Sequence, residues 1–100
     1  MNMTKKLDSD TVTVFVEGWL DTLTAARFHT GVQELEGAKN VILDLSGVDY
    51  ISSAGLREVV ALYRSVTGGG GSFSVRGVVP AVMDVFTLTG FDKKLDIAPA

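Results

Sequence analysis

Two adjacent serines carry the clearest chemical potential in this sequence. Ser52 and Ser53 follow the apolar segment 41–45 and stand where helical spacing begins. The first N–H groups of a helix have no partner within it and lie at the positive end of its dipole, so an anion is stabilised there. A phosphate on either hydroxyl would therefore be tolerated, and the small residues Ala54 and Gly55 leave the backbone approachable.

The same serines also have a purely structural interpretation. Serine is strongly preferred at the N-cap, where its side-chain oxygen accepts a hydrogen bond from a backbone N–H of the first turn. Because caps are so common, the residue types alone favour capping over modification. Leu56 would anchor this first turn in the core.

Three further motifs are incomplete versions of enzyme signatures. Segment 51–55 resembles half of a G-x-S-x-G nucleophile elbow, but Ile51 occupies the place of the first glycine. The single histidine, His29, falls in a different predicted helix, so nothing in the spacing supports a Ser-His-Asp arrangement. The glycine run 68–71 lacks the Lys-Ser/Thr ending of a P-loop. We therefore predict no enzymatic activity and no catalytic residues.

Three strands are expected to position the serines. Residues 11–16 alternate polar and apolar, which predicts a strand with one buried face that ends at Gly18. Residues 41–45 are nearly all apolar, as in a strand at the centre of a sheet, and a loop is expected over 46–51. A further strand is expected at 72–76. Shorter strands are compatible with Leu7, before a turn over 8–10, and with residues 94–97.

Helices are expected between these strands. The first is capped by Thr22 or Thr24, has Ala25, Phe28, Val32 and Leu35 on one face, and ends near Gly37. The second begins around Ser53 and stops at the glycine run. The third covers 81–89 after Pro80 and ends at Gly90. Alternation of strands and helices predicts an α/β fold with a partly parallel sheet in a single domain spanning residues 1–100.

Composition limits the classes of function. The chain has 100 residues, 46% of them apolar, which suits one small core. A net charge of −3 without a Lys/Arg cluster argues against direct nucleic-acid binding. No apolar run approaches the roughly 20 residues of a membrane-spanning helix, no secretion signal is visible, and Cys is absent. We expect a cytoplasmic domain without cofactor, metal or membrane insertion.

Three segments together resemble STAS domains, and in particular the bacterial anti-sigma-factor antagonists. They are residues 44–56, which contain the serine pair, residues 18–25 and residues 88–92. In their expected order they account for most of the chain, from about 11 to 97. The resemblance implies a STAS-like sandwich, with a mixed four- to five-stranded sheet and helices packed mainly on one face.

The resemblance also assigns roles to individual residues. It implies that Ser53 is the phosphorylated serine, while Ser52 stands where other members carry aspartate. It places Asp21 on the surface near the phosphorylation loop, with helix capping as the structural alternative. Trp19 is either an exposed anchor for a partner or packed against the sheet edge. The predicted partner-binding residues are Trp19, Asp21, Ser52, Ser53, Ala54 and Gly55. Asp44 is expected to support the loop by accepting backbone N–H groups.

The implied function is a phosphorylation switch. The unphosphorylated protein would bind an anti-sigma factor with serine kinase activity and thereby free a sigma factor. Phosphorylation at Ser53 would add a charge of about −1.5 to −2 and disrupt that interface. The alternative is a constitutive STAS scaffold subunit of a membrane lipid-transport or other signalling complex, in which Ser53 is only structural. The oligomeric state and the cognate sigma factor stay open.

Overall fold

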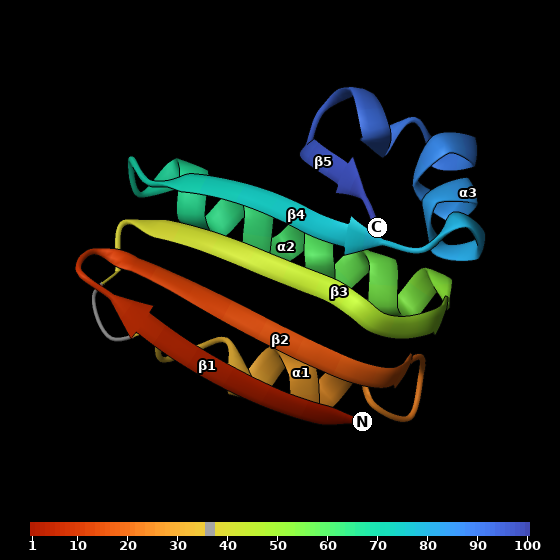
Figure 1. Cartoon of the computed structure of the whole chain (residues 1–100), viewed down its shortest axis with the longest axis horizontal. Helices are drawn as coiled ribbons and strands as arrows, with labels where there is room; N and C mark the ends of the chain where they lie inside the picture. The colour runs from red at the N-terminus through yellow and green to blue at the C-terminus, as the bar shows by residue number, and fades with distance from the viewer. Residues whose placement is uncertain (36–37) are drawn as a thin grey trace.

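Five strands form one mixed sheet in the computed structural model, which describes residues 1–35 and 38–100. The strands lie in the order of the chain, β1-β2-β3-β4-β5 (Figure 1). β1 pairs antiparallel with β2, and every later pair is parallel. Parallel neighbours require crossover connections, and the helices supply them. The predicted α/β class and mixed sheet are confirmed.

β1 (Asn2–Asp8) and β2 (Thr11–Leu20) form a hairpin at one edge of the sheet. Their connection contains Ser9, which adopts the left-handed conformation at φ 58°, as turn residues often do. The short strand predicted around Leu7 is thus present and extends over all of β1. In β2 the alternation places Val12, Val14 and Val16 in the core, as the sequence pattern predicts.

The predicted end of β2 at Gly18 is wrong, because the strand continues to Leu20. Gly18 has φ 95°, a conformation that glycine adopts without steric cost, and the pairing with β3 shifts register between Gly18 and Trp19. The glycine therefore marks an irregularity inside the strand. Beyond it, Trp19 and Leu20 still pair with the neighbouring strand.

β3 (Asn40–Ile51) lies at the centre of the sheet between β2 and β4 (Ser72–Val78). Val41, Leu43 and Leu45 are buried, which confirms the expected central strand. The loop predicted over 46–51 is instead the second half of β3. Its polar residues looked loop-like in sequence, but Val48 and Ile51 are buried while Asp49 and Tyr50 face solvent.

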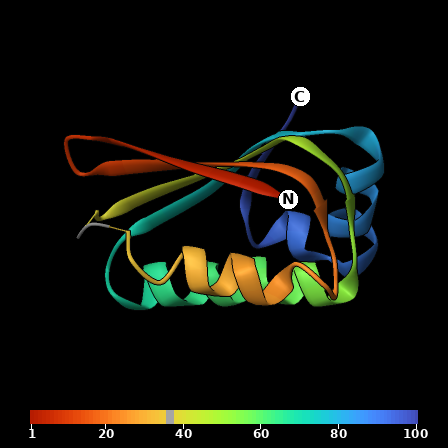
Figure 2. The same ribbon diagram turned by 90° about the horizontal axis from the view of Figure 1, so that it is seen from below.

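α1 (Ala25–Gly31) and α2 (Ser53–Gly68) cover one face of the sheet side by side (Figure 2). α1 is shorter than predicted: Lys5 Nζ donates to the carbonyl of Gly31, the last residue of the helix, and to the carbonyl of Glu34 beyond it. Leu35 packs against the core from beyond the helix. The predicted end near Gly37 lies outside the described residues.

The C-terminal part agrees with the sequence pattern. α3 (Pro80–Thr89) has Pro80 in its first turn and ends at Gly90, whose φ of 80° provides a left-handed C-cap. A short 3₁₀ helix, η1 (Phe91–Lys93), then leads to β5 (Asp96–Pro99), which pairs with β4. The last segment is therefore a strand rather than an extended tail.

Candidate functional site

The carboxyl ends of β2 and β3 meet at one edge of the sheet, where α1 and α2 also begin (Figure 1). Trp19 pairs with Tyr50 and Leu20 with Ile51. The backbone N–H of Ser52 donates to the carbonyl of Leu20 over 2.9 Å, which ties the start of α2 to the neighbouring strand. The sheet thus brings residues 19–24 and 50–57 to the same end of the molecule.

The two serines, which could not be told apart by residue type alone, differ in the structure: one caps α2 and the other is exposed. Ser52 is the N-cap of α2: it has extended backbone angles, and its side-chain oxygen accepts from the N–H of Gly55 at 3.2 Å. Ser53 is the first helical residue and is exposed. Its hydroxyl makes no side-chain hydrogen bond to any other described residue. The structure thus leaves Ser53 accessible, because its neighbour does the capping.

Gly55 has a packing role beneath this surface. A Cβ on Gly55 would lie 2.3 Å from the carbonyl oxygen of Leu20, a backbone atom that cannot move aside. The residue is buried, so we do not place it among surface contacts. Glycine here lets the first turn of α2 approach β2 closely, and this approach sets the direction in which Ser53 projects. Ala54 is partly exposed beside it.

Asp21 organises the turn before α1. Its Oδ1 accepts from the N–H groups of Leu23 and Thr24 at 3.0 and 3.1 Å and from the Thr24 hydroxyl. The Thr24 hydroxyl in turn accepts from the N–H of Asp21 at 2.9 Å. Asp21 therefore closes the turn that precedes α1, and its described side-chain hydrogen bonds reach no N–H of the helix itself. Thr24 itself stands at the N-cap of α1 but makes no side-chain cap bond there.

Exposed apolar side chains gather at the same strand ends. Trp19 is 59% exposed, Tyr50 48% and Leu23 87%. The rings of Trp19 and Tyr50 lie 5.3 Å apart at a tilt of 52°, a separation typical of interacting aromatic pairs. We call Trp19, Leu23 and Tyr50 the strand-end patch. Sequence reasoning singled out Trp19 alone, because the register that pairs Tyr50 with it was not visible in the sequence.

Asp44 supports its own strand and does not reach the serines. Its Oδ1 accepts from the N–H and the hydroxyl of Ser46, at 2.9 and 2.6 Å. These bonds lie within β3, next to the register shift near Gly47. The expected backbone N–H acceptor role is thus present, but at Ser46 rather than around Ser53.

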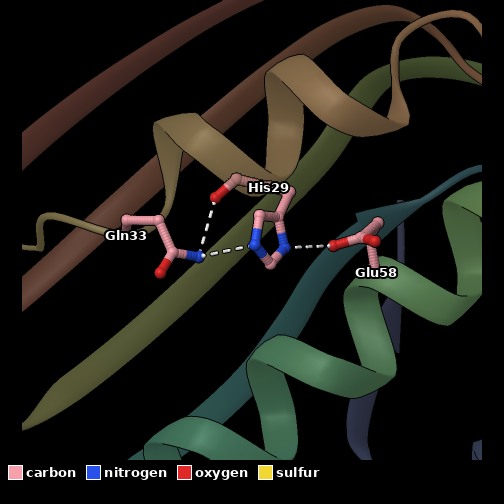
Figure 3. A network of polar contacts seen from close by, with 3 residues as sticks. All are labelled: His29, Gln33 and Glu58. Carbon is pink, nitrogen blue, oxygen red and sulfur yellow. Dashed lines mark hydrogen bonds and ion pairs between the residues drawn. The ribbon is translucent and has the colours of Figure 1, made fainter.

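His29 is engaged away from Ser53. Its Nδ1 lies 2.8 Å from Oε1 of Glu58, and Gln33 Nε2 lies 3.4 Å from its Nε2, so the three side chains form a polar contact between α1 and α2 (Figure 3). No described hydrogen bond connects the imidazole to Ser53, so the described contacts of His29 do not join it to the predicted modification site. The described part of the chain also holds no group of three or more potential metal ligands.

No helix within residues 1–35 and 38–100 is both long and apolar enough to cross a bilayer. The residues at this end of the sheet are an exposed serine, a capping serine, an aspartate that closes the turn before α1, and the strand-end patch. Such a surface is suited to contact with another macromolecule, since exposed aromatic residues are typical anchors of interfaces.

Comparison with known proteins yields one family model and several relatives. The model, described as "Mlab, STAS domain", matches residues 3–97. BtrV of Bordetella bronchiseptica is 39% identical over 56 residues, which cover 56% of this chain and 48% of that protein. The anti-sigma-B factor antagonist of Listeria monocytogenes is 25% identical over 95 residues, covering 93% of this chain and 83% of the relative.

Solved structures show the same fold. An anti-sigma factor antagonist from Mycobacterium paratuberculosis superposes with a TM-score of 0.87 at 27% identity, covering 99% of this chain and 86% of that one. SpoIIAA, an anti-sigma factor antagonist, covers 97% of this chain in both of its structures. Its unphosphorylated form matches over 88% of its own length with a TM-score of 0.81 at 19% identity. Its phosphorylated form matches over 91% with a TM-score of 0.74 at 18%.

Proposed function

Because this chain belongs to the family of STAS domains described as "Mlab, STAS domain", we propose that it is an anti-sigma-factor antagonist switched by phosphorylation of Ser53. In the unmodified state it binds an anti-sigma factor that has serine kinase activity, and this binding frees a sigma factor in the cytoplasm. The relatives and structural neighbours that are named anti-sigma factor antagonists support this assignment.

The observation that carries the proposal is the exposed Ser53 at the end of the sheet where the strand-end patch also lies. Ser52 supplies the cap, so modification of Ser53 removes no hydrogen bond of the fold. The kinase transfers the γ-phosphoryl group of ATP to the Ser53 oxygen: a P–O bond forms there, the hydroxyl proton is released, and the bond to ADP breaks. The product carries a charge of about −1.5 to −2 on the docking surface.

Phosphate weakens binding through the partner rather than through unfolding. The start of α2 accommodates an anion, so the fold persists. A partner seated on Trp19, Tyr50 and Leu23 must then desolvate the dianion or lie against it, and like-charge contacts across an interface cost several kcal/mol. Phosphorylation therefore changes which partners can bind to this surface, while the fold stays the same.

The proposal is tested with a candidate serine kinase of the histidine-kinase-like ATPase superfamily. The chain is incubated with that kinase and ATP, and the modified residue is mapped by mass spectrometry. Binding is followed through the emission of Trp19, the single tryptophan of the chain. We expect phosphate on Ser53, binding by Ser53→Ala, and weak binding by Ser53→Asp.

Ser52→Ala is the matched control. It removes the cap but leaves Ser53 in place, so it is expected to lower stability while the kinase still modifies the chain. Equal binding by Ser53→Ala and Ser53→Asp, or phosphate on another residue, would contradict the switch.

A constitutive scaffold role is the second candidate. The description of the family model as Mlab, and a strand-end patch that can bind without any modification, favour it. In this case the chain is a STAS subunit of a membrane lipid-transport or other signalling complex. Equal binding by the two Ser53 variants, together with weak binding by Trp19→Ala, would support it over the switch.

A further inference from the structure

A groove lies beside Ser53, lined by residues of α2 and by Phe91 at the start of η1. This groove has a volume of about 320 Å³, and Ser53 forms part of its lining. Leu56, Val60 and Phe91 contribute apolar side chains, and Arg57 and Arg64 contribute the charged ones. None of the lining residues is acidic. The groove is therefore a positively charged surface with the exposed serine at one end.

Both arginines are free to accept an anion. Within residues 1–35 and 38–100, neither Arg57 nor Arg64 makes a side-chain hydrogen bond or an ion pair. By contrast, Arg76 is paired with Asp96. Guanidinium groups bind phosphate oxygens in a fork of parallel hydrogen bonds, so an unpaired arginine beside a modifiable hydroxyl is chemically matched to a phosphate.

The helix geometry separates the two arginines. Arg57 follows Ser53 by four residues, and residues at this spacing are neighbours on a helix surface, with Cβ atoms roughly 5–6 Å apart. Helical side chains lean towards the N-terminus, so Arg57 leans towards Ser53. Arg64 lies eleven residues beyond Ser53, roughly 16 Å along the axis, which exceeds the reach of its side chain. An anion that precedes a cation by four residues is also the favoured order.

We propose that Arg57 binds the phosphate of phosphorylated Ser53 and holds it in this groove. This inference rests on the proposed function and adds to it how the modified state is organised. The phosphate then occupies the end of the groove that Ser53 lines, in one position rather than many. Before modification, the same end of the groove is open and carries the unpaired guanidinium.

The test measures the second pKa of the phosphate directly. Phosphoserine is incorporated at position 53 by genetic-code expansion into the full chain and into the Arg57→Gln and Arg64→Gln variants. Each phosphoprotein is titrated by ³¹P NMR through the second phosphate pKa, which lies at about 6. A neighbouring cation favours the dianion and lowers the pKa of the phosphate, so removing that cation raises it.

We expect Arg57→Gln to raise the phosphate pKa by about half a unit or more, since an opposite charge at close range shifts a carboxyl by 1–3 units in more buried settings. Arg64→Gln has the same change of charge in the same groove and should leave the pKa within about 0.2 unit of the parent. Other charged or titratable groups on or near these elements are Asp49 on β3, Glu58 on α2 with His29 in contact with it, Asp92 and Lys93 on η1, and Lys94 directly after η1. They are identical in all three proteins.

An unchanged pKa in Arg57→Gln would overturn the inference. Equal shifts in the two variants would also overturn it, because they would indicate only the general surface potential. Since the phosphate is installed during synthesis, the measurement does not depend on any kinase. Failure of a kinase to modify Ser53 would therefore count against the proposed function and leave this result standing.

Discussion

The turns before α1 and α2 follow neighbouring parallel strands, yet they are stabilised in different ways. The turn before α1 is closed by its own residues, because Asp21 and Thr24 exchange hydrogen bonds within four positions. The start of α2 also depends on the neighbouring strand: Ser52 N–H donates to the carbonyl of Leu20, and Gly55 packs against that carbonyl.

The difference assigns each turn a separate part of the proposed site. A turn held by local bonds can project an apolar side chain into solvent, as Leu23 does at 87% exposure. A helix start that rests on the sheet keeps Ser53 at a defined position relative to Trp19 and Tyr50. In the proposed switch, the docking area comes mainly from one turn and the strand ends, and the regulated hydroxyl comes from the start of α2.

Among the substitutions that test this comparison, Gly55→Ala is expected to have the largest effect on stability. The new Cβ would meet the Leu20 carbonyl at 2.3 Å, so α2 must shift, at a cost of about 1–3 kcal/mol in the free energy of unfolding. Urea denaturation measures the loss. Gly68→Ala is the matched control, because a Cβ there meets nothing within 4 Å. Equal stability of the two variants would show that α2 does not depend on its contact with β2.

Trp19→Ala tests whether the strand-end patch is the docking surface. Truncating an aromatic anchor at the centre of an interface is expected to weaken partner binding at least tenfold, which corresponds to about 1.4 kcal/mol. Isothermal titration calorimetry with the partner measures the affinity, since the variant lacks the fluorescent residue. Leu88→Ala, an equally apolar change on α3 at 85% exposure, serves as the control. Unchanged affinity in Trp19→Ala would place the docking surface elsewhere.

Asp21→Ala and Ser52→Ala compare the aspartate that closes the turn before α1 with the serine that caps α2. Each variant leaves backbone N–H groups without a side-chain acceptor and is expected to lose about 1 kcal/mol of stability. Hydrogen exchange separates them: Asp21→Ala should lower protection at Leu23 and Thr24, and Ser52→Ala should lower it at Gly55. If Asp21→Ala also exposed the N–H of Gly55, the two turns would be coupled and the contrast between them would fail.

The smallest effect on stability is expected from a substitution away from both turns, in the Arg76–Asp96 pair on β4 and β5. The hydrogen bond from Arg76, aided by its charge and opposed by desolvation, holds the pKa of Asp96 below its ordinary 3.8. A lowered pKa means that the pair stabilises the fold above about pH 4, and that this contribution is lost as the pH falls through the folded pKa.

Arg76→Gln should therefore slightly lower the urea midpoint near neutral pH and leave it unchanged at strongly acidic pH. Because both side chains are exposed, at 41% and 67%, the change is small. A loss that persists at acidic pH would show that Arg76 contributes by packing instead of by its charge.

Much of the fold could be predicted from local patterns. The alternation over 11–16, the apolar run over 41–45 and the glycine run after α2 each indicated the correct element. Errors arose where an element continues through residues that look like its end. β2 passes Gly18, and β3 continues over 46–51, because hydrogen bonds to a neighbouring strand hold residues that have no strand pattern of their own.

For the candidate site, the sequence by itself determined which functional groups are available. These are two serines before one helix, an aspartate before another helix, and a single tryptophan. Local side-chain rules predicted caps at these places: Ser52 caps α2, whereas Asp21 accepts from N–H groups of the turn before α1. Only the tertiary structure decided that Ser52 caps and Ser53 is exposed, that Tyr50 lies against Trp19, and that Arg57 shares a groove with Ser53 and Phe91. These relations depend on strand register and on the packing of α2 and η1, which join residues far apart in the chain and leave no local pattern in it.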